Sequence, residues 1–121
     1  DLKMLPIVGR ITAGEPIRAE ENVEGFHPIP KNQINGNKYF WLRVQGNSMI
    51  DAGIEDGDLV LIREQETVEN GEIAVVMVNS EEATLKKVYK AERQLVLQPA
   101  NDDYSPIFVD NKQQLHLGKN I

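Results

Sequence analysis

The alternation of apolar and polar side chains predicts short β-strands over most of the chain. Between residues 38 and 44, Phe40, Leu42 and Val44 fall on one face of an extended segment, and the residues between them fall on the other face. Further apolar runs predict strands at 59–62, 73–78, 83–90, 94–98, 107–109 and 115–117, the second and third of them joined as a β-hairpin.

The first third of the chain has a weaker pattern that is broken by glycine and proline. Residues 5–16 alternate short apolar pieces with these breakers, which predicts extended chain or an edge strand. Residues 17–37 are mostly polar, and we expect a long, partly irregular connection with one short strand. Residues 48–54 suit one or two helical turns, and no segment carries a longer helical period. Together these patterns predict a mostly β fold of many short antiparallel strands with very little helix.

Composition limits the size of the protein and its partners. A chain of 121 residues suits one domain with a single hydrophobic core. It carries 13 Lys and Arg against 19 Asp and Glu, and the net charge of −6 disfavours binding to nucleic acid by this segment alone. The absence of cysteine excludes disulfides, thiol nucleophiles and cysteine-based zinc sites. The apolar runs are far shorter than the ~20 residues that a membrane span needs.

Histidines and clustered carboxylates offer two conventional kinds of site, and the sequence favours neither. His27 and His116 lie far apart in the chain without a neighbouring metal-ligand pattern, so we interpret them as packing or solvated residues. The acidic cluster after residue 50 lacks the ligand order of a calcium-binding loop and is better explained as a turn with solvated carboxylates. Its members are Asp51, Glu55, Asp56 and Asp58.

The segment Gly46-Asn47-Ser48-Met49 places a hydroxyl where a strand ends and a helical turn begins. Backbone N–H groups converge beside such a residue, which is the geometry that an oxyanion hole needs. A serine in this place also commonly caps the helical turn. Both interpretations stand on this segment alone.

A nucleophilic serine needs a base, and a lysine kept neutral by burial can replace histidine in that role. Lys86 and Lys87 lie in the predicted strand 83–90 and point to opposite faces. The pattern does not decide which of them points inward. Both also suit an exposed edge strand, where lysine discourages aggregation.

Three blocks of sequence, in this order, resemble a known family. They are residues 8–16 around the dipeptide Ala13-Gly14, residues 46–59 around Ser48, and residues 83–87. The chain resembles, from residue 5 to about residue 118, the C-terminal self-cleaving domain of LexA-type SOS repressors, whose relatives include the UmuD polymerase-accessory proteins and lambda-like phage repressors. The resemblance implies a LexA/signal-peptidase-like fold of several short, coiled antiparallel sheets.

The resemblance also implies the roles of individual residues. Ser48 would be the nucleophile and Lys86, rather than Lys87, the general base. The bond between Ala13 and Gly14 would be cut, and the backbone N–H groups of Ser48 and Asn47 would form the oxyanion hole. No metal and no cofactor is implied.

By the same resemblance we expect a single domain over residues 1–121, with the cleavage-site region at about 5–18 and a catalytic core at about 38–118. The implied function is that of a bacterial, cytoplasmic transcriptional repressor that cuts itself when the RecA–single-stranded DNA filament stimulates it, so that DNA-damage genes are released. DNA would be bound through an N-terminal winged helix-turn-helix that this chain lacks. A homodimer is expected for the full-length protein, and no membrane partner is expected.

Three alternatives remain open. A UmuD-like accessory protein usually has cysteine before the cleaved glycine, so Ala13 favours the repressor modestly. A non-catalytic dimerisation module of a phage-type repressor would keep the fold without needing Ser48 and Lys86 together. A membrane signal peptidase of related fold would need an anchor segment, which this sequence does not contain.

Overall fold

The computed structural model of the protein describes residues 1–10, 17–36, 38–78, 82–110 and 117–120. These residues form nine strands and three short 3₁₀ turns. The strands are β1 (Leu2–Val8), β2 (Val23–Pro30), β3 (Tyr39–Arg43), β4 (Leu59–Gln65), β5 (Glu72–Val78), β6 (Glu82–Lys90), β7 (Gln94–Gln98), β8 (Ile107–Asp110) and β9 (Leu117–Asn120), and the turns are η1 (Glu20–Asn22), η2 (Lys31–Gln33) and η3 (Ile50–Ala52).

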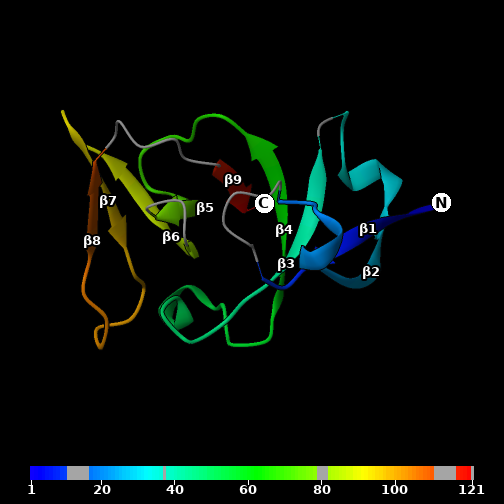
Figure 1. Cartoon of the computed structure of the whole chain (residues 1–121), viewed down its shortest axis with the longest axis horizontal. Coiled ribbons are helices and arrows are strands. Elements are labelled where there is room, and N and C mark those ends of the chain that lie inside the picture. Colours follow the sequence, from blue (N-terminus) through cyan, green and yellow to red (C-terminus); the bar gives the residue numbers. More distant parts are fainter. Residues whose placement is uncertain (11–16, 37, 79–81, 111–116, 121) are drawn as a thin grey trace.

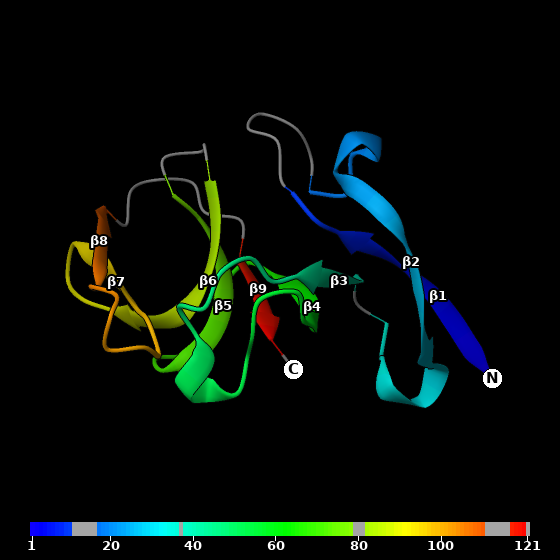
Figure 2. The same ribbon diagram turned by 90° about the horizontal axis from the view of Figure 1, so that it is seen from below.

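Hydrogen bonds join the described strands in the order β2-β1-β3-β4-β9-β5-β6-β7-β8. The β1–β3 pair is parallel, and the other pairs in this order are antiparallel. The sheet curls so that β1 and β2 form an arm at one end, while β5 to β8 wrap around the other end (Figures 1 and 2). The predicted mostly β fold with little helix is therefore confirmed. Within the described residues, no helix is long and apolar enough to cross a membrane.

The alternation in β3 places its side chains as predicted. Phe40 and Leu42 are buried in the main core, with Val44 following them in the same cluster. Tyr39, on the opposite face, is buried in a separate cluster with Leu5. Both faces of β3 are thus covered, so this strand is fixed firmly between the arm and the rest of the sheet.

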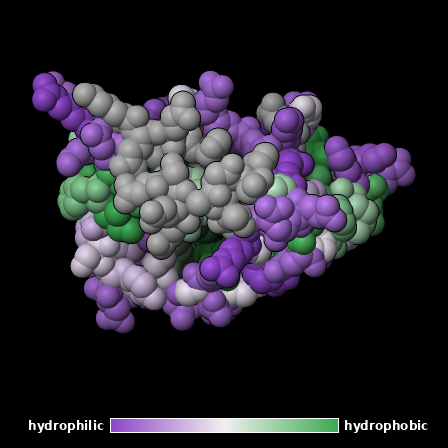
Figure 3. Space-filling model, viewed as in Figure 1, coloured by the Kyte–Doolittle hydropathy of each residue, from purple (hydrophilic) through white to green (hydrophobic). Residues whose placement is uncertain are grey.

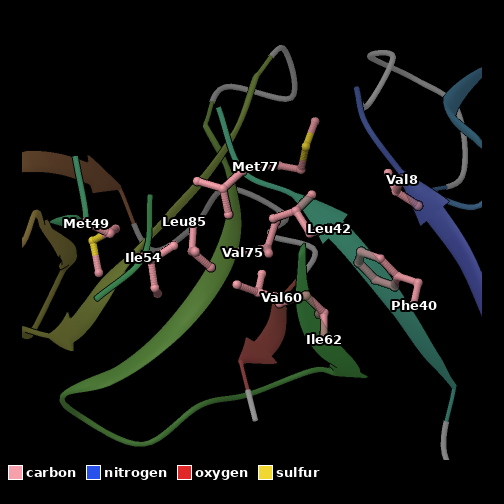
Figure 4. Packing of buried hydrophobic residues seen from close by; sticks show 11 residues of the cluster. Val8, Phe40, Leu42, Met49, Ile54, Val60, Ile62, Val75, Met77 and Leu85 are labelled. Carbon is pink, nitrogen blue, oxygen red and sulfur yellow. The ribbon is translucent and has the colours of Figure 1, made fainter. Parts of the chain in front are cut away.

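The main core joins the middle strands to the turn that follows β3. Met49 and Ile54, from this turn, pack with Leu85 of β6 (Figure 4). Full burial of side chains of this size stabilises a fold by about 1.5–3 kcal/mol each. The turn that carries Ser48 is therefore held against β6. The full cluster is Val8, Phe40, Leu42, Val44, Met49, Ile54, Val60, Ile62, Val75, Met77 and Leu85.

A second core lies on the other side of β5 and β6. Val76 of β5 and Val88 of β6 are fully buried in it together with Leu97 of β7. Both faces of β6 are therefore covered by apolar side chains, which is why a lysine within β6 can be buried. Exposed hydrophobic surface gathers instead at the two ends of the molecule, over β7–β8 and over β1–β2 (Figure 3).

The arm departs from the sequence prediction in two respects. Residues 17–37 contain the eight-residue strand β2 between η1 and η2, where a long, partly irregular connection with one short strand was predicted. Proline is tolerated there because β2 ends the strand order of the described residues, so one side of its backbone needs no partner. Residues 5–16 were predicted to be extended chain or an edge strand. Residues 5–8 are extended and belong to β1, but β1 lies inside the sheet between β2 and β3.

Two further boundaries differ from the prediction. Strand β4 continues to Gln65, beyond the predicted end at residue 62. Of the strand predicted at 115–117, residues 115 and 116 lie outside the described residues, and β9 begins at Leu117. β9 pairs with both β4 and β5, and so joins the two halves of the sheet.

Candidate active site

The turn after β3 presents Ser48 at the surface of the main core. Gly46 has a φ of +81°, a left-handed conformation that glycine adopts without strain. Its N–H donates to Asp56 Oδ1 at 2.6 Å. Val44 N donates to the Asp58 carbonyl at 2.8 Å, and Gly57 N donates to the Val44 carbonyl at the same distance. These bonds tie the end of β3 to the 55–58 turn and fix the direction in which the chain leaves it.

The hydroxyl of Ser48 does not cap the helical turn. η3 has Met49 at its N-cap position, with no side-chain capping bond. Instead, Lys86 Nζ donates a hydrogen bond to Ser48 Oγ at 2.8 Å. The capping interpretation left open by the sequence is therefore wrong, and the hydroxyl faces an amine.

Lys86 is the buried member of the lysine pair. It is 7% exposed and lies directly opposite Ala74 of β5, whose small side chain leaves room beside it. Its Nζ also donates to Thr84 Oγ1 at 2.6 Å. Lys87, on the other face of β6, is half-buried. The two hydroxyls hold the Lys86 amine at the end of its side chain, between β6 and the Ser48 turn.

A loop after β7 holds the Ser48 turn from the other side. Ala100 N donates to the Ser48 carbonyl, and Asp51 N donates to the Ala100 carbonyl, each at 2.8 Å. The side-chain amide of Asn101 donates to the Asn47 carbonyl at 2.8 Å. The sequence pattern did not single out Thr84, Ala100 or Asn101. For Thr84, its spacing of two residues from Lys86 on a strand was the available signal.

Two backbone donors at this turn are available to a ligand. Among the hydrogen bonds of the described residues, none uses the N–H of Asn47 or the N–H of Ser48. Both groups lie next to the Ser48 hydroxyl in the chain. Neighbouring N–H groups without a protein acceptor are what a negatively charged oxygen requires as a binding site.

A cleft of about 600 Å³ opens over Ser48 and Lys86. Leu42, Leu85 and Met49 contribute apolar wall, and Gly9 and Arg10 also line the cleft. Gln45 Nε2 donates to the Gly9 carbonyl at 2.9 Å. The chain that leaves β1 therefore enters the same cleft that holds the serine and the lysine.

The predicted cleavage site, Ala13 and Gly14, lies outside the described residues. Asn22, which is 2% exposed, holds the described chain before and after these residues. Gly9 N donates to the Asn22 carbonyl at 3.1 Å, and Asn22 Nδ2 donates to the Ile17 carbonyl at 3.1 Å. Ile17 itself packs against the main core.

The described residues of this cleft include no histidine and no cluster of metal ligands. His27 is exposed on β2, where its ring meets the Trp41 ring edge-on with centroids 5.2 Å apart, and it does not line the cleft. His116 lies outside the described residues. Asp56 and Asp58 accept hydrogen bonds from backbone N–H groups of the turn. In the part of the chain that the structure describes, no group of three or more histidine or acidic side chains is placed to hold a metal.

Comparison with known proteins places the chain in a family. The LexA repressor of Desulfitobacterium hafniense is 51% identical over 104 residues, which cover 86% of this chain and 50% of that protein. The LexA repressors of Brevibacillus brevis and Limosilactobacillus reuteri are 46% and 47% identical over 88% and 90% of this chain. The chain spans about half the length of these curated relatives. The sequence profile described as Peptidase S24-like matches residues 6–120, and the chain therefore belongs to that family.

Proposed function

We propose that this chain is the self-cleaving domain of a LexA-type SOS repressor, and that it hydrolyses its own Ala13–Gly14 peptide bond. Ser48 acts as the nucleophile and Lys86 as the general base. One observation carries the proposal: a buried lysine amine lies 2.8 Å from a serine hydroxyl inside a cleft that the chain before Ala13 also enters. That pairing is the minimum that nucleophilic catalysis by serine requires when histidine is absent.

The reaction proceeds in two steps. The neutral amine of Lys86 accepts the proton of Ser48 Oγ as this oxygen attacks the carbonyl carbon of Ala13. Lys86 then passes the proton to the nitrogen of Gly14, the C–N bond breaks, and Ala13 remains attached to Ser48 as an ester. Water attacks the ester, and Lys86 accepts one proton of this water and returns it to Ser48 Oγ. Ala13 leaves as a carboxylic acid, which loses the second proton of the water to solvent.

The N–H groups of Ser48 and Asn47 hold the negative oxygen that develops on Ala13. Neither group is engaged by another described residue, so both remain available at the moment of attack. Such preorganised donors contribute because they need no reorganisation in the transition state.

Lys86 must lose its proton before it can act as a base. An ordinary lysine, with a pKa near 10.4, is almost entirely charged at neutral pH. Burial disfavours a charged amine, and Lys86 is 7% exposed. Thr84 Oγ1, at 2.6 Å, fixes the direction of the amine so that it remains aligned with Ser48. Docking of apolar side chains such as Ile11 and Ile17 over the site would remove further water.

The substrate is supplied by the same chain. Arg10 lines the cleft, and Ala13 follows it by three residues, which span at most about 10 Å when extended. Because Arg10 and Ser48 line the same cleft, we expect the scissile bond to reach Ser48 while β1 stays in place. An attached substrate has a high effective concentration, so control must come from whether the segment is docked.

Docking of this segment is the step that we assign to the RecA–single-stranded DNA filament. The repressor activity rests on the similarity to LexA repressors, of which this chain spans about half. DNA binding then belongs to an N-terminal winged helix-turn-helix, and dimerisation to the full-length protein. Within the chain, residues of about 5–18 form the cleavage-site region and those of about 38–118 form the catalytic core.

Mass spectrometry under denaturing conditions tests the proposal directly. After incubation at alkaline pH, the wild-type chain should give the fragments 1–13 and 14–121. Ser48→Ala and Lys86→Met should stay intact, while Lys87→Met, which changes the neighbouring lysine, should be cut. Addition of the RecA filament at neutral pH should speed the cut in the wild-type chain. An intact wild-type chain under both conditions, or cleavage in Ser48→Ala, would refute the proposal.

A further inference from the structure

Asn101 connects two segments that are 54 residues apart in the chain. Its Oδ1 accepts a hydrogen bond from Asp103 N at 2.9 Å, and its carbonyl accepts one from Tyr104 N at 3.1 Å. Its Nδ2 donates to the Asn47 carbonyl at 2.8 Å. The loop after β7 thus fixes one side of the amide, and the other side holds the turn that carries Ser48.

The carbonyl that Asn101 holds belongs to the same peptide unit as the Ser48 N–H. A trans peptide is planar, and its C=O and N–H point in opposite directions. Within the described residues, no peptide bond is cis. A bond that fixes the Asn47 oxygen therefore fixes the direction of the Ser48 N–H as well. Ile50 N also donates to this oxygen, at 3.2 Å, but it belongs to the same turn and moves with it.

We propose that Asn101 is a positioning residue that aims the Ser48 N–H at the carbonyl oxygen of Ala13. The inference rests on the proposed self-cleavage and adds a residue that touches neither the substrate nor the reacting atoms. The Asn101 side chain donates to the turn from outside it. This hydrogen bond therefore opposes rotation of the whole turn, and with it rotation of the peptide plane. Loss of a complete oxyanion donor slows catalysis about 10²–10³-fold. Loss of the alignment of this donor should slow catalysis less, and we expect the cleavage rate to decrease about 10–100-fold.

The pH profile separates this role from that of the base. The Asn101 side chain bonds to the Asn47 carbonyl, whereas the Lys86 amine bonds to Ser48 and Thr84. Asn101→Ala should therefore lower the cleavage rate by one factor at every pH and leave the pH at which the rate levels off unchanged. The backbone bonds between Ala100 and the Ser48 turn remain in this variant. Cleavage of the wild-type chain and no cleavage of Ser48→Ala establish beforehand that the reaction itself is as proposed.

Asn101→Asp separates aiming from simple support of the loop. It keeps the oxygen that accepts from Asp103 N and replaces the N–H donor with a second oxygen that repels the Asn47 carbonyl. If Asn101 aims the peptide, Asn101→Asp is as slow as Asn101→Ala or slower. Asp103→Ala is the matched control in the same loop, because it keeps both side-chain bonds of Asn101 and should cut at the wild-type rate.

Rates are measured over pH 7–10 on folded protein, with circular dichroism as the check of folding. A wild-type rate in both Asn101 variants, recovery of the rate in Asn101→Asp, or a displaced pH profile in Asn101→Ala would overturn the inference. If Asn101→Ala unfolds, Asn101→Asp decides, because its loop bond to Asp103 is retained.

Discussion

The rate of self-cleavage should rise tenfold for each pH unit until Lys86 is mostly neutral. The perturbation is a change of pH from 7 to 10 at constant ionic strength. Lys86 Nζ contacts Ser48 Oγ and Thr84 Oγ1, and only the amine without its extra proton can take a proton from the serine. The rate then follows the neutral fraction of one group.

The size of the effect follows from this single ionisation. With a pKa near 10.4, about 0.04% of a lysine is neutral at pH 7 and about 4% at pH 9, a hundredfold increase. The tenfold slope below the plateau does not depend on the pH at which the plateau lies.

Time courses of intact mass, taken under denaturing conditions at each pH, measure the slope. Arg10, Arg43 and Tyr104 also line the cleft. Arginine does not lose its proton in this range, and Tyr104→Phe controls for the phenol. Lys87→Met should keep the slope. A flat profile in the wild-type chain, or the same slope in Lys86→Met, would refute the assignment of the base.

Substitutions at three further positions test how the site is held. Thr84→Val removes the acceptor at 2.6 Å from Lys86 Nζ, so the amine is less well aligned with Ser48 and we expect a plateau rate about tenfold lower. Thr84→Ser should behave as wild type. Rates across pH measure this, and an unchanged plateau rate in Thr84→Val would exclude this role. Met49 is 1% exposed, so Met49→Ala should lower the free energy of unfolding by about 2–5 kcal/mol and Met49→Leu by less than about 1.5 kcal/mol. Urea denaturation measures both values. Equal losses in the two variants would count against tight packing beneath Ser48. Gly46→Ala should lower the free energy of unfolding by about 1–2 kcal/mol, because alanine is strained at the positive φ of this position. An added Cβ meets no atom within 4 Å, so we expect no steric clash in addition. A urea midpoint equal to that of the wild type would contradict this.

Local patterns predicted those parts of the fold whose neighbours are close in sequence. The alternation in β3 and the hairpin of β5 and β6 were both predicted, since each depends on residues within one or two strands. The length of β2 was underestimated because Pro28 and Pro30 interrupt a strand unless it lies at the edge of a sheet. Edge position is a property of the assembled sheet, which the local pattern does not contain.

The same limit applies to the candidate site. Alternation left Lys86 and Lys87 equivalent because both faces of β6 are covered, and only the resemblance to LexA-type repressors favoured Lys86. On the tetrapeptide alone, Ser48 suited a helix cap as well as a nucleophile, because the tetrapeptide contains no sign of a distant amine. Asn101 could not be found from the pattern, since its contact with Asn47 exists only after the loop behind β7 meets the turn behind β3.

The place of β1 in the sheet determines what a cut between residues 13 and 14 would leave behind. β1 lies before that bond, yet both of its neighbours, β2 and β3, lie after it. Gly9 also forms hydrogen bonds with Asn22 and Gln45, which both follow the Ala13–Gly14 bond in the sequence. Hydrolysis would therefore nick the protein without dividing it. The short N-terminal fragment would remain bound as β1 within the sheet. Size-exclusion chromatography under native conditions would then show one species, whereas a denaturing gel would show two fragments.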